Sequence, residues 1–278
     1  ETQRAILQRF AKLLRPDGLL FTGHAETLFR ATDLFEPRGN TMYGLRGPAA
    51  QQASAPPTRL YAPAAEAMPA WKPAASESAA PKRDSLQLRD ALIFVGSSTG
   101  GPEALKQLLA GLPAECPPIL ITQHIPAGHV PALVQRLSSA SRIQVNEGAH
   151  GAVVRRGNAY IAPGHSHMRL RRVGTRFVID LDQAPPVSRH RPSVDVLFHS
   201  AAQITGTPTV GIILTGMGAD GAEGLLAMKR AGAATYAQDQ ASSVVFGMPR
   251  QAIALGAVDE VLPINAIVRR VLQSLTRK

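Results

Sequence analysis

The chain has 278 residues, 45% of them apolar, which is enough to bury a core of substantial size. It contains no apolar run of about eighteen residues, no apolar signal core and only one cysteine, Cys116. A membrane span and an internal disulfide are therefore excluded, nothing marks the chain for secretion, and a cytoplasmic location is expected. The net charge of +10 would suit nucleic acid, anionic lipid or an acidic protein.

The basic residues are scattered, with little aromatic interleaving, so a solvated basic surface is the favoured interpretation. Steering toward an acidic protein partner is the alternative, and neither nucleic-acid binding nor membrane insertion is expected.

Residues 1–47 form a short first segment. Apolar residues recur at helical spacing over 3–14, and residues 19–21 and 41–45 have the pattern of short strands. One helix and two strands bury too little surface to be stable alone. We therefore expect the segment to be the end of a larger domain.

Residues 48–88 differ in composition from the rest of the chain. Thirteen of the 35 residues from 48 to 82 are alanine and seven are proline. Repeated proline prevents a long helix, and few large apolar side chains are present to form a core. This composition predicts a semi-extended linker.

From residue 89 to 278, apolar strands alternate with amphipathic helices. Strands are predicted at 91–95, 118–122, 159–162, 177–181, 209–214 and 233–237, and helices at 102–111, 128–139, 193–204, 220–231, 248–255 and 264–275. This pattern predicts an α/β domain with a doubly wound, mostly parallel sheet and helices on both faces. The stretch 148–182 alternates like a small antiparallel hairpin insertion.

Ligands of open parallel sheets bind beyond the carboxyl ends of the strands, so reactive residues at those ends are the candidates. Ser98 lies in the string VGSSTGGPE, where a strand runs into a tight turn and Pro102 opens a helix. The string fits G-x-S-x-G, and the amides at a helix start could stabilise an oxyanion. A nucleophile, a capping turn and a phosphate cradle all remain open.

His124 ends a second apolar strand, PILITQH, on the same predicted edge. A general base for Ser98 would have to lie within hydrogen-bond reach, which neighbouring strands provide. A histidine satisfied by the local backbone is the alternative.

Asp220 follows a third apolar strand and a glycine loop, GIILTGMGADG, where a helix is predicted to begin. An aspartate there can simply cap that helix. Alternatively, it orients the imidazole as the third member of a triad. Met217 is unusual in such a loop, and its backbone amide could matter more than its side chain.

Two further groups are weaker candidates. His165 and His167 have a metal-like spacing but no acidic or cysteine partner nearby, so no metal is expected. Residues 189–192 (RHRP) could bind an anion or form a charged surface turn. The order Ser, His, Asp differs from the triads of α/β-hydrolases, chymotrypsin and subtilisin, which would make it an independent solution.

At these residues the sequence resembles the catalytic domain of the chemotaxis protein-glutamate methylesterases, the CheB family. The resemblance rests on the strings VGSSTGGPEAL, ITQHIPAGHV, YIAPGHSHM, RHRPSVDVLFHS, ILTGMGADGAEGL and VVFGMPRQAI, in family order. It implies hydrolysis of glutamate methyl esters on the cytoplasmic helices of chemoreceptors, with release of methanol, and deamidation of receptor glutamines. It also implies that Ser98 is the nucleophile, His124 the base and Asp220 its partner, with Thr99 and Met217 lining the site and no cofactor.

Proteins of this family usually begin with a phosphorylatable receiver domain, which the first segment does not resemble. Residues 1–47 instead look like the end of the opposing chemoreceptor methyltransferase, CheR, through TQRAILQRF, LLRPDGLLFTGHAE and RGNTMYGL. A fragment of a fusion or a truncated reading frame is expected, and a receiver acting in trans is left open. The alternative to an enzyme is a non-catalytic α/β module that binds an anion or a partner through GSSTGG.

Overall fold

The computed structural model describes residues 7–8, 10–11, 19–21, 34–39, 42–45 and 88–276. Contacts within the chain divide it into two units, Glu1–Pro81 and Lys82–Lys278, each of which is described by itself. The predicted linker lies outside the described residues, except for Leu88 at its end.

The first unit contains a small antiparallel sheet in the order β1-β3-β2. Its strands are β1 (Leu19–Phe21), β2 (Phe35–Gly39) and β3 (Met42–Leu45). The predictions for 19–21 and 41–45 are confirmed, the second with a start one residue later. β2 was not predicted, because its sequence FEPRG has no apolar alternation. Of the predicted helix 3–14, residues 7, 8, 10 and 11 are helical and the others lie outside the described residues.

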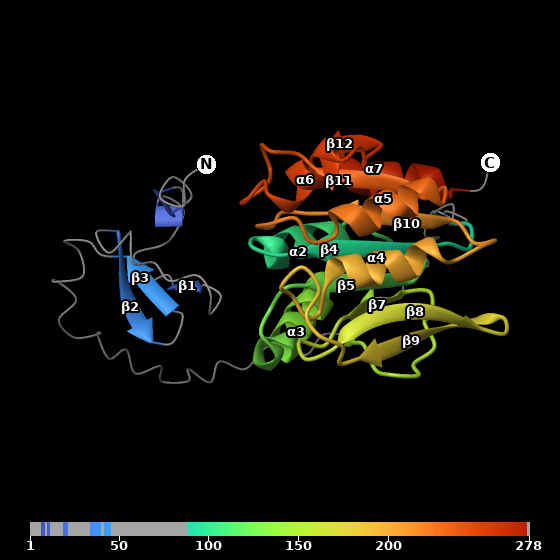
Figure 1. The fold of residues 1–278 in the computed structure, drawn as a ribbon, viewed down its shortest axis with the longest axis horizontal. Helices are drawn as coiled ribbons and strands as arrows, with labels where there is room; N and C mark the ends of the chain where they lie inside the picture. The colour runs from blue at the N-terminus through green and yellow to red at the C-terminus, as the bar shows by residue number, and fades with distance from the viewer. Residues whose placement is uncertain are drawn as a thin grey trace, which may run out of the picture. The chain divides into compact units, whose positions relative to one another are not determined.

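The second unit is built on a seven-stranded sheet in the order β12-β11-β10-β4-β5-β7-β6 (Figure 1). Every neighbouring pair in it is parallel. Its strands are β4 (Leu92–Ser97), β5 (Ile119–Gln123), β6 (Gln144–Glu147), β7 (Asn158–Ile161), β10 (Thr209–Ile213), β11 (Ala234–Gln238) and β12 (Glu260–Leu262). β6 and β12 were not predicted, since one is largely polar and the other has only three residues.

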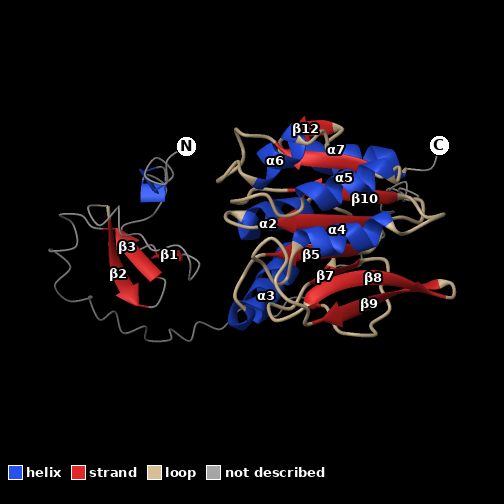
Figure 2. Cartoon of the chain, viewed as in Figure 1, coloured by secondary structure: helices blue, strands red, loops and turns tan. Residues whose placement is uncertain are grey.

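Helices and a hairpin cover the two faces of this sheet (Figure 2). They are α2 (Gly101–Ala110), the 3-10 turn η2 (Ala127–His129), α3 (Val130–Ala140), α4 (Val194–Ala202), α5 (Ala222–Arg230), α6 (Met248–Ala254) and α7 (Ile264–Leu275). The hairpin pairs β8 (His167–Val173) with β9 (Arg176–Asp182) in antiparallel register. The predicted hairpin insertion is therefore confirmed, although β7 within 148–182 belongs to the main sheet.

Alternation along the strands separates two cores. Ile93 and Val95 of β4 pack with α2, α3 and α7, whereas Leu92 and Phe94 pack with α4, α5, α6 and the hairpin. Each face of the strand thus buries apolar side chains under helices, which explains the continuous apolar runs in the sequence. The predicted doubly wound α/β architecture is confirmed.

The order of the strands places a topological switch point beside β4. The chain passes from β4 to β5 on one side and later returns to β10 on the other side. In sheets of this kind the crevice at the switch point is where ligands bind. Within the part of the chain that the structure describes, no helix is long and apolar enough to cross a membrane.

Candidate active site

Ser98 lies in the tight turn between β4 and α2. Its N–H donates to the carbonyl oxygen of Thr215 at 3.0 Å, and its carbonyl accepts from the N–H of Gly101 at 2.8 Å. The loop after β10 approaches closely, because a Cβ added to Gly216 would lie 2.8 Å from the Ser98 Cβ. Only glycine allows this contact, so the turn and the loop are held together at the switch point.

His124 follows β5, directly beside Ser98. The strands pair Ser97 with Gln123, and the His124 N–H donates to the Ser97 carbonyl at 3.0 Å. The imidazole Nε2 lies 2.7 Å from Asp220 Oδ2, and the side chain is only 8% exposed. The other nitrogen, Nδ1, is buried without a hydrogen-bond partner among the described residues. The Ser98 hydroxyl forms no hydrogen bond within the same part of the chain.

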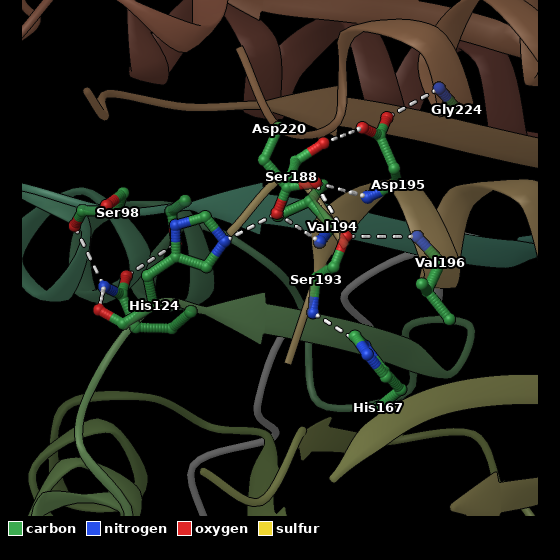
Figure 3. A network of polar contacts seen from close by, with 12 residues as sticks. Ser98, His124, His167, Ser188, Ser193, Val194, Asp195, Val196, Asp220 and Gly224 are labelled. Atoms are coloured by element: carbon green, nitrogen blue, oxygen red, sulfur yellow. Dashed lines mark hydrogen bonds and ion pairs between the residues drawn. The ribbon is translucent and has the colours of Figure 1, made fainter. Parts of the chain in front are cut away.

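Asp220 does not cap the helix that follows it, so the capping interpretation named the wrong helix. The N-cap of α5 is Gly221, and that helix has no side-chain cap. Asp220 instead reaches the first turn of α4 (Figure 3).

Four hydrogen bonds fix the Asp220 carboxylate. Oδ1 accepts from Ser193 Oγ at 2.7 Å and from the Asp195 N–H at 3.0 Å. Oδ2 accepts from the Val194 N–H at 2.8 Å and pairs with His124 at 2.7 Å. The carboxylate therefore lies between the positive end of α4 and the imidazole, as Figure 3 shows.

These contacts determine the charge of Asp220. Burial acts to raise its pKa, but the hydrogen bond and charge of His124 act in the opposite direction, together with the donors on Asp195 and Ser193. The net result is a pKa below the ordinary value for aspartate. Asp220 is therefore ionised and can hold the Nε2 proton of His124, which leaves the lone pair on Nδ1.

Thr99 and Met217, predicted to line the site, lie in the Ser98 turn and in the loop after β10 that approaches it. Thr99 follows Ser98 in the turn, and its carbonyl accepts from Thr215 Oγ1 at 2.9 Å. Met217 follows Gly216, and half of its side chain is exposed. Neither residue's N–H donates to another of the described residues.

His190 completes the surroundings of the imidazole and was missed as a partner of His124. The two rings are stacked, with centroids 3.7 Å apart and an interplanar angle of 10°. Burial lowers the pKa of His190, and the neighbouring His124 lowers it further. The sequence contains only an indirect signal, the charged RHRP string at 189–192.

Ser193 and Asp195 were also missed, because nothing in the local sequence links α4 to Asp220. The histidine pair considered for a metal is not brought together as ligands. His167 is fully buried, with Nδ1 accepting from the Ser193 N–H and Nε2 bonded to the Pro185 carbonyl. Across the described ranges, no group of three His, Cys, Asp or Glu residues could hold a metal ion.

Comparison with known proteins identifies relatives of this chain. The family model described as CheB methylesterase matches residues 93–271. The protein-glutamate methylesterase/protein-glutamine glutaminase 2 of Bordetella avium is 51% identical over 229 residues, which are 82% of this chain and 59% of that protein. The corresponding protein of Methylobacillus flagellatus is 58% identical over 184 residues, 66% of this chain and 52% of that protein.

A solved structure is also similar to this chain. The crystal structure of the Thermotoga maritima CheB methylesterase catalytic domain aligns with a TM-score of 0.65 and 37% identity. It covers 67% of this chain and all of the solved chain. This chain thus spans between half and three fifths of the curated relatives that it matches. The match over residues 93–271 shows that the chain belongs to the CheB methylesterase family.

Proposed function

We propose that this protein hydrolyses glutamate methyl esters on proteins and deamidates glutamines, with Ser98, His124 and Asp220 as its catalytic residues. One observation carries the proposal: Asp220 fixes the imidazole of His124 at Nε2, while Nδ1 is buried without a hydrogen-bond partner among the described residues. His124 and Ser98 follow the paired ends of two neighbouring strands, so this nitrogen is available at the edge of the sheet that carries Ser98. The names of the relatives, protein-glutamate methylesterase/protein-glutamine glutaminase, support both reactions.

The first half of the reaction forms an acyl-enzyme. His124 Nδ1 takes the proton of the Ser98 hydroxyl as its oxygen attacks the ester carbonyl. The resulting imidazolium is stabilised by the ionised Asp220 at Nε2. The N–H groups of Thr99 and Met217 donate to the oxyanion of the tetrahedral intermediate. The intermediate then collapses, and methanol leaves with the proton from Nδ1.

The second half regenerates the enzyme. A water molecule gives a proton to Nδ1 and attacks the glutamyl ester of Ser98. When this second intermediate collapses, Nδ1 returns the proton to Ser98 Oγ, and glutamate is released from the free serine. A glutamine substrate follows the same path, with ammonia leaving in place of methanol. These steps require no metal or organic cofactor, because one imidazole carries every proton.

The biological setting completes the proposal. The substrates are methylated cytoplasmic helices of bacterial chemoreceptors, which makes the enzyme part of adaptation in chemotaxis and places it in the cytoplasm. A receiver domain acting in trans would be its regulatory partner. We assign residues 1–47 to an end segment resembling the methyltransferase CheR, 48–88 to a linker and 89–278 to the catalytic domain. Deletion of residues 1–82 is expected to preserve activity and Tm, whereas a Tm lower by many degrees would contradict this division.

The test of the proposed chemistry is the Ser98→Ala variant. Wild-type protein should release methanol from a methylated receptor fragment, with a loss of one CH2 per ester in the intact mass of the fragment. Ser98→Ala should remain folded and release none, because loss of a triad serine typically costs several orders of magnitude in rate. An organophosphonate should label Ser98 in the wild type. Displacement of the probe by phosphate without any labelling would support the non-catalytic binding module instead.

A further inference from the structure

Gln123 is a buried side chain that the proposed chemistry does not use. It is the last residue of β5, immediately before His124, and only 2% of it is exposed. Its amide Nε2 donates to the carbonyl oxygens of Ser98 and His124, each at 2.9 Å. Its Oε1 accepts from Ser97 Oγ at 2.7 Å. The Gln123 amide is thus bonded to the backbone of both Ser98 and His124. It is also bonded to Ser97, the last residue of the strand that leads to Ser98.

The first residue of α2 makes room for this amide. A Cβ added to Gly101 would lie 1.9 Å from Gln123 Oε1 and 2.9 Å from its Cδ. No real Cβ approaches an oxygen so closely, so an alanine at 101 would displace the amide. The position of Gln123 therefore explains why residue 101 is a glycine.

The two carbonyl groups depend on Gln123 to different degrees. The Ser98 carbonyl also accepts from the Gly101 N–H at 2.8 Å, so it keeps one donor if the amide is lost. The His124 carbonyl has no second donor among the described residues. Loss of the amide should therefore free the backbone of His124 more than that of Ser98, and so change the position of His124 relative to the Ser98 hydroxyl.

We propose that Gln123 is a positioning residue that fixes the separation of Ser98 and His124; this inference rests on the proposed function. Gln123 touches neither substrate nor reacting atoms. Its effect is on the geometry in which a proton passes from Ser98 to Nδ1, and small misplacements of such groups lower the rate of the chemical step rather than substrate binding.

The first test is Gln123→Met, which keeps the length of the side chain and removes both donors. We expect kcat for methanol release to fall at least about tenfold with KM within about twofold, because the substrate contacts are unchanged. The rate of Ser98 labelling by a fluorophosphonate should fall in parallel. Val271→Ala, a cavity variant in the α7 core, is the control for stability. It should lower Tm and leave kcat unchanged.

The second test leaves Gln123 in the chain and displaces its side-chain amide with a substitution at Gly101. Gly101→Ala should lower kcat as Gln123→Met does, since the new methyl group occupies the site of Oε1. The same change in a Gln123→Ala background should cost much less, because the colliding group is gone. Independent effects of the two substitutions on kcat would contradict the proposal, and this cycle decides the matter if Gln123→Met does not fold.

Wild type and Ser98→Ala separate the two levels of inference. If wild type releases methanol, Ser98→Ala does not, and folded Gln123→Met retains wild-type kcat, the role of Gln123 is overturned and the proposed function stands. If wild type itself releases no methanol and is not labelled, the proposed function fails and the role of Gln123 fails with it.

Discussion

Two buried carboxylates meet at the first turn of α4 and behave in opposite ways. Asp220 accepts four hydrogen bonds and has a lowered pKa. Asp195 accepts from the Gly224 N–H at 2.8 Å and from Ser188 Oγ at 3.2 Å. Burial raises the pKa of Asp195, and the charge of Asp220 raises it further, while the Gly224 N–H offsets only part of the rise. Burial is similar for both, so the number and charge of the donors determine the direction in which each pKa shifts.

The largest effect is expected from neutralising Asp220, the carboxylate that accepts more hydrogen bonds. Asp220→Asn keeps one acceptor oxygen but replaces the other by an NH2 group. That NH2 group would face hydrogen-bond donors on α4 or on His124, with which it cannot bond. Turnover should fall by about 10⁴-fold, as it does when other triads lose their orienting carboxylate. The Asp220→Asn substitution should also reduce the unfolding free energy by about 1–3 kcal/mol. At a simple helix cap the same substitution would be nearly neutral, because Asn caps about as well as Asp. Methanol release and urea unfolding measure the two effects. Near-normal turnover in the folded variant would reduce Asp220 to a structural role.

A smaller effect is expected from removing one donor. Ser193→Ala deletes the hydroxyl that bonds to Asp220 Oδ1. Because Oδ1 keeps the Asp195 N–H as a donor, the loss of unfolding free energy at neutral pH should be about 1.5 kcal/mol, the lower end of the range for a bond to a charged group.

The pH dependence of the unfolding free energy of Ser193→Ala shows whether the lost stability comes from the ionised Asp220. The lowered pKa of Asp220 means that its stabilising contribution is present above the unfolded-state pKa and is lost as pH falls through the folded-state pKa. Removal of a donor raises the folded-state pKa, so stability should be lost at a higher pH than in the wild type. Parallel curves of unfolding free energy against pH would show that the hydroxyl does not affect the ionisation of Asp220.

The smallest effect is expected at the other carboxylate. Asp195→Asn still offers an oxygen to the Gly224 N–H and removes a charge that burial disfavours. The unfolding free energy at pH 7 should change by less than about 1 kcal/mol.

For Asp195 the sign of the pH effect is reversed. Its raised pKa contributes stability that is fully present below the unfolded-state pKa and is lost as pH rises through the folded-state pKa. The Asn variant should lack this loss, so its advantage over the wild type should grow from acid to neutral pH. An unfolding free energy that drops by several kcal/mol at pH 7 would mean that the ionised carboxylate is required.

The sequence was sufficient to predict five of the seven strands of the sheet and to place Ser98 and His124 on one edge of it. Both follow long apolar strands that are consecutive in the chain, so neighbouring strand ends could be inferred from local patterns. The partners of Asp220 could not be inferred in this way. Its hydrogen bonds join a loop after β10 to α4, between 25 and 27 residues earlier, and no periodicity encodes that contact. For this reason a local capping rule can offer Asp220 only as a cap of α5, which is one of the two interpretations that the sequence left open.

The place of β4 in the middle of the sheet has a consequence for the order of folding. β4 and β5 are close in sequence, so the half of the site with Ser98 and His124 closes a short loop. Asp220 arrives only when β10 docks on the other side of β4, and it is 96 residues from His124 in the chain. During synthesis, Ser98 and His124, the proposed nucleophile and base, are thus expected to come together before Asp220, the residue proposed to orient the base. We expect the nascent chain to remain inactive until β10 pairs with β4, so the proposed hydrolysis would begin only after the sheet has formed.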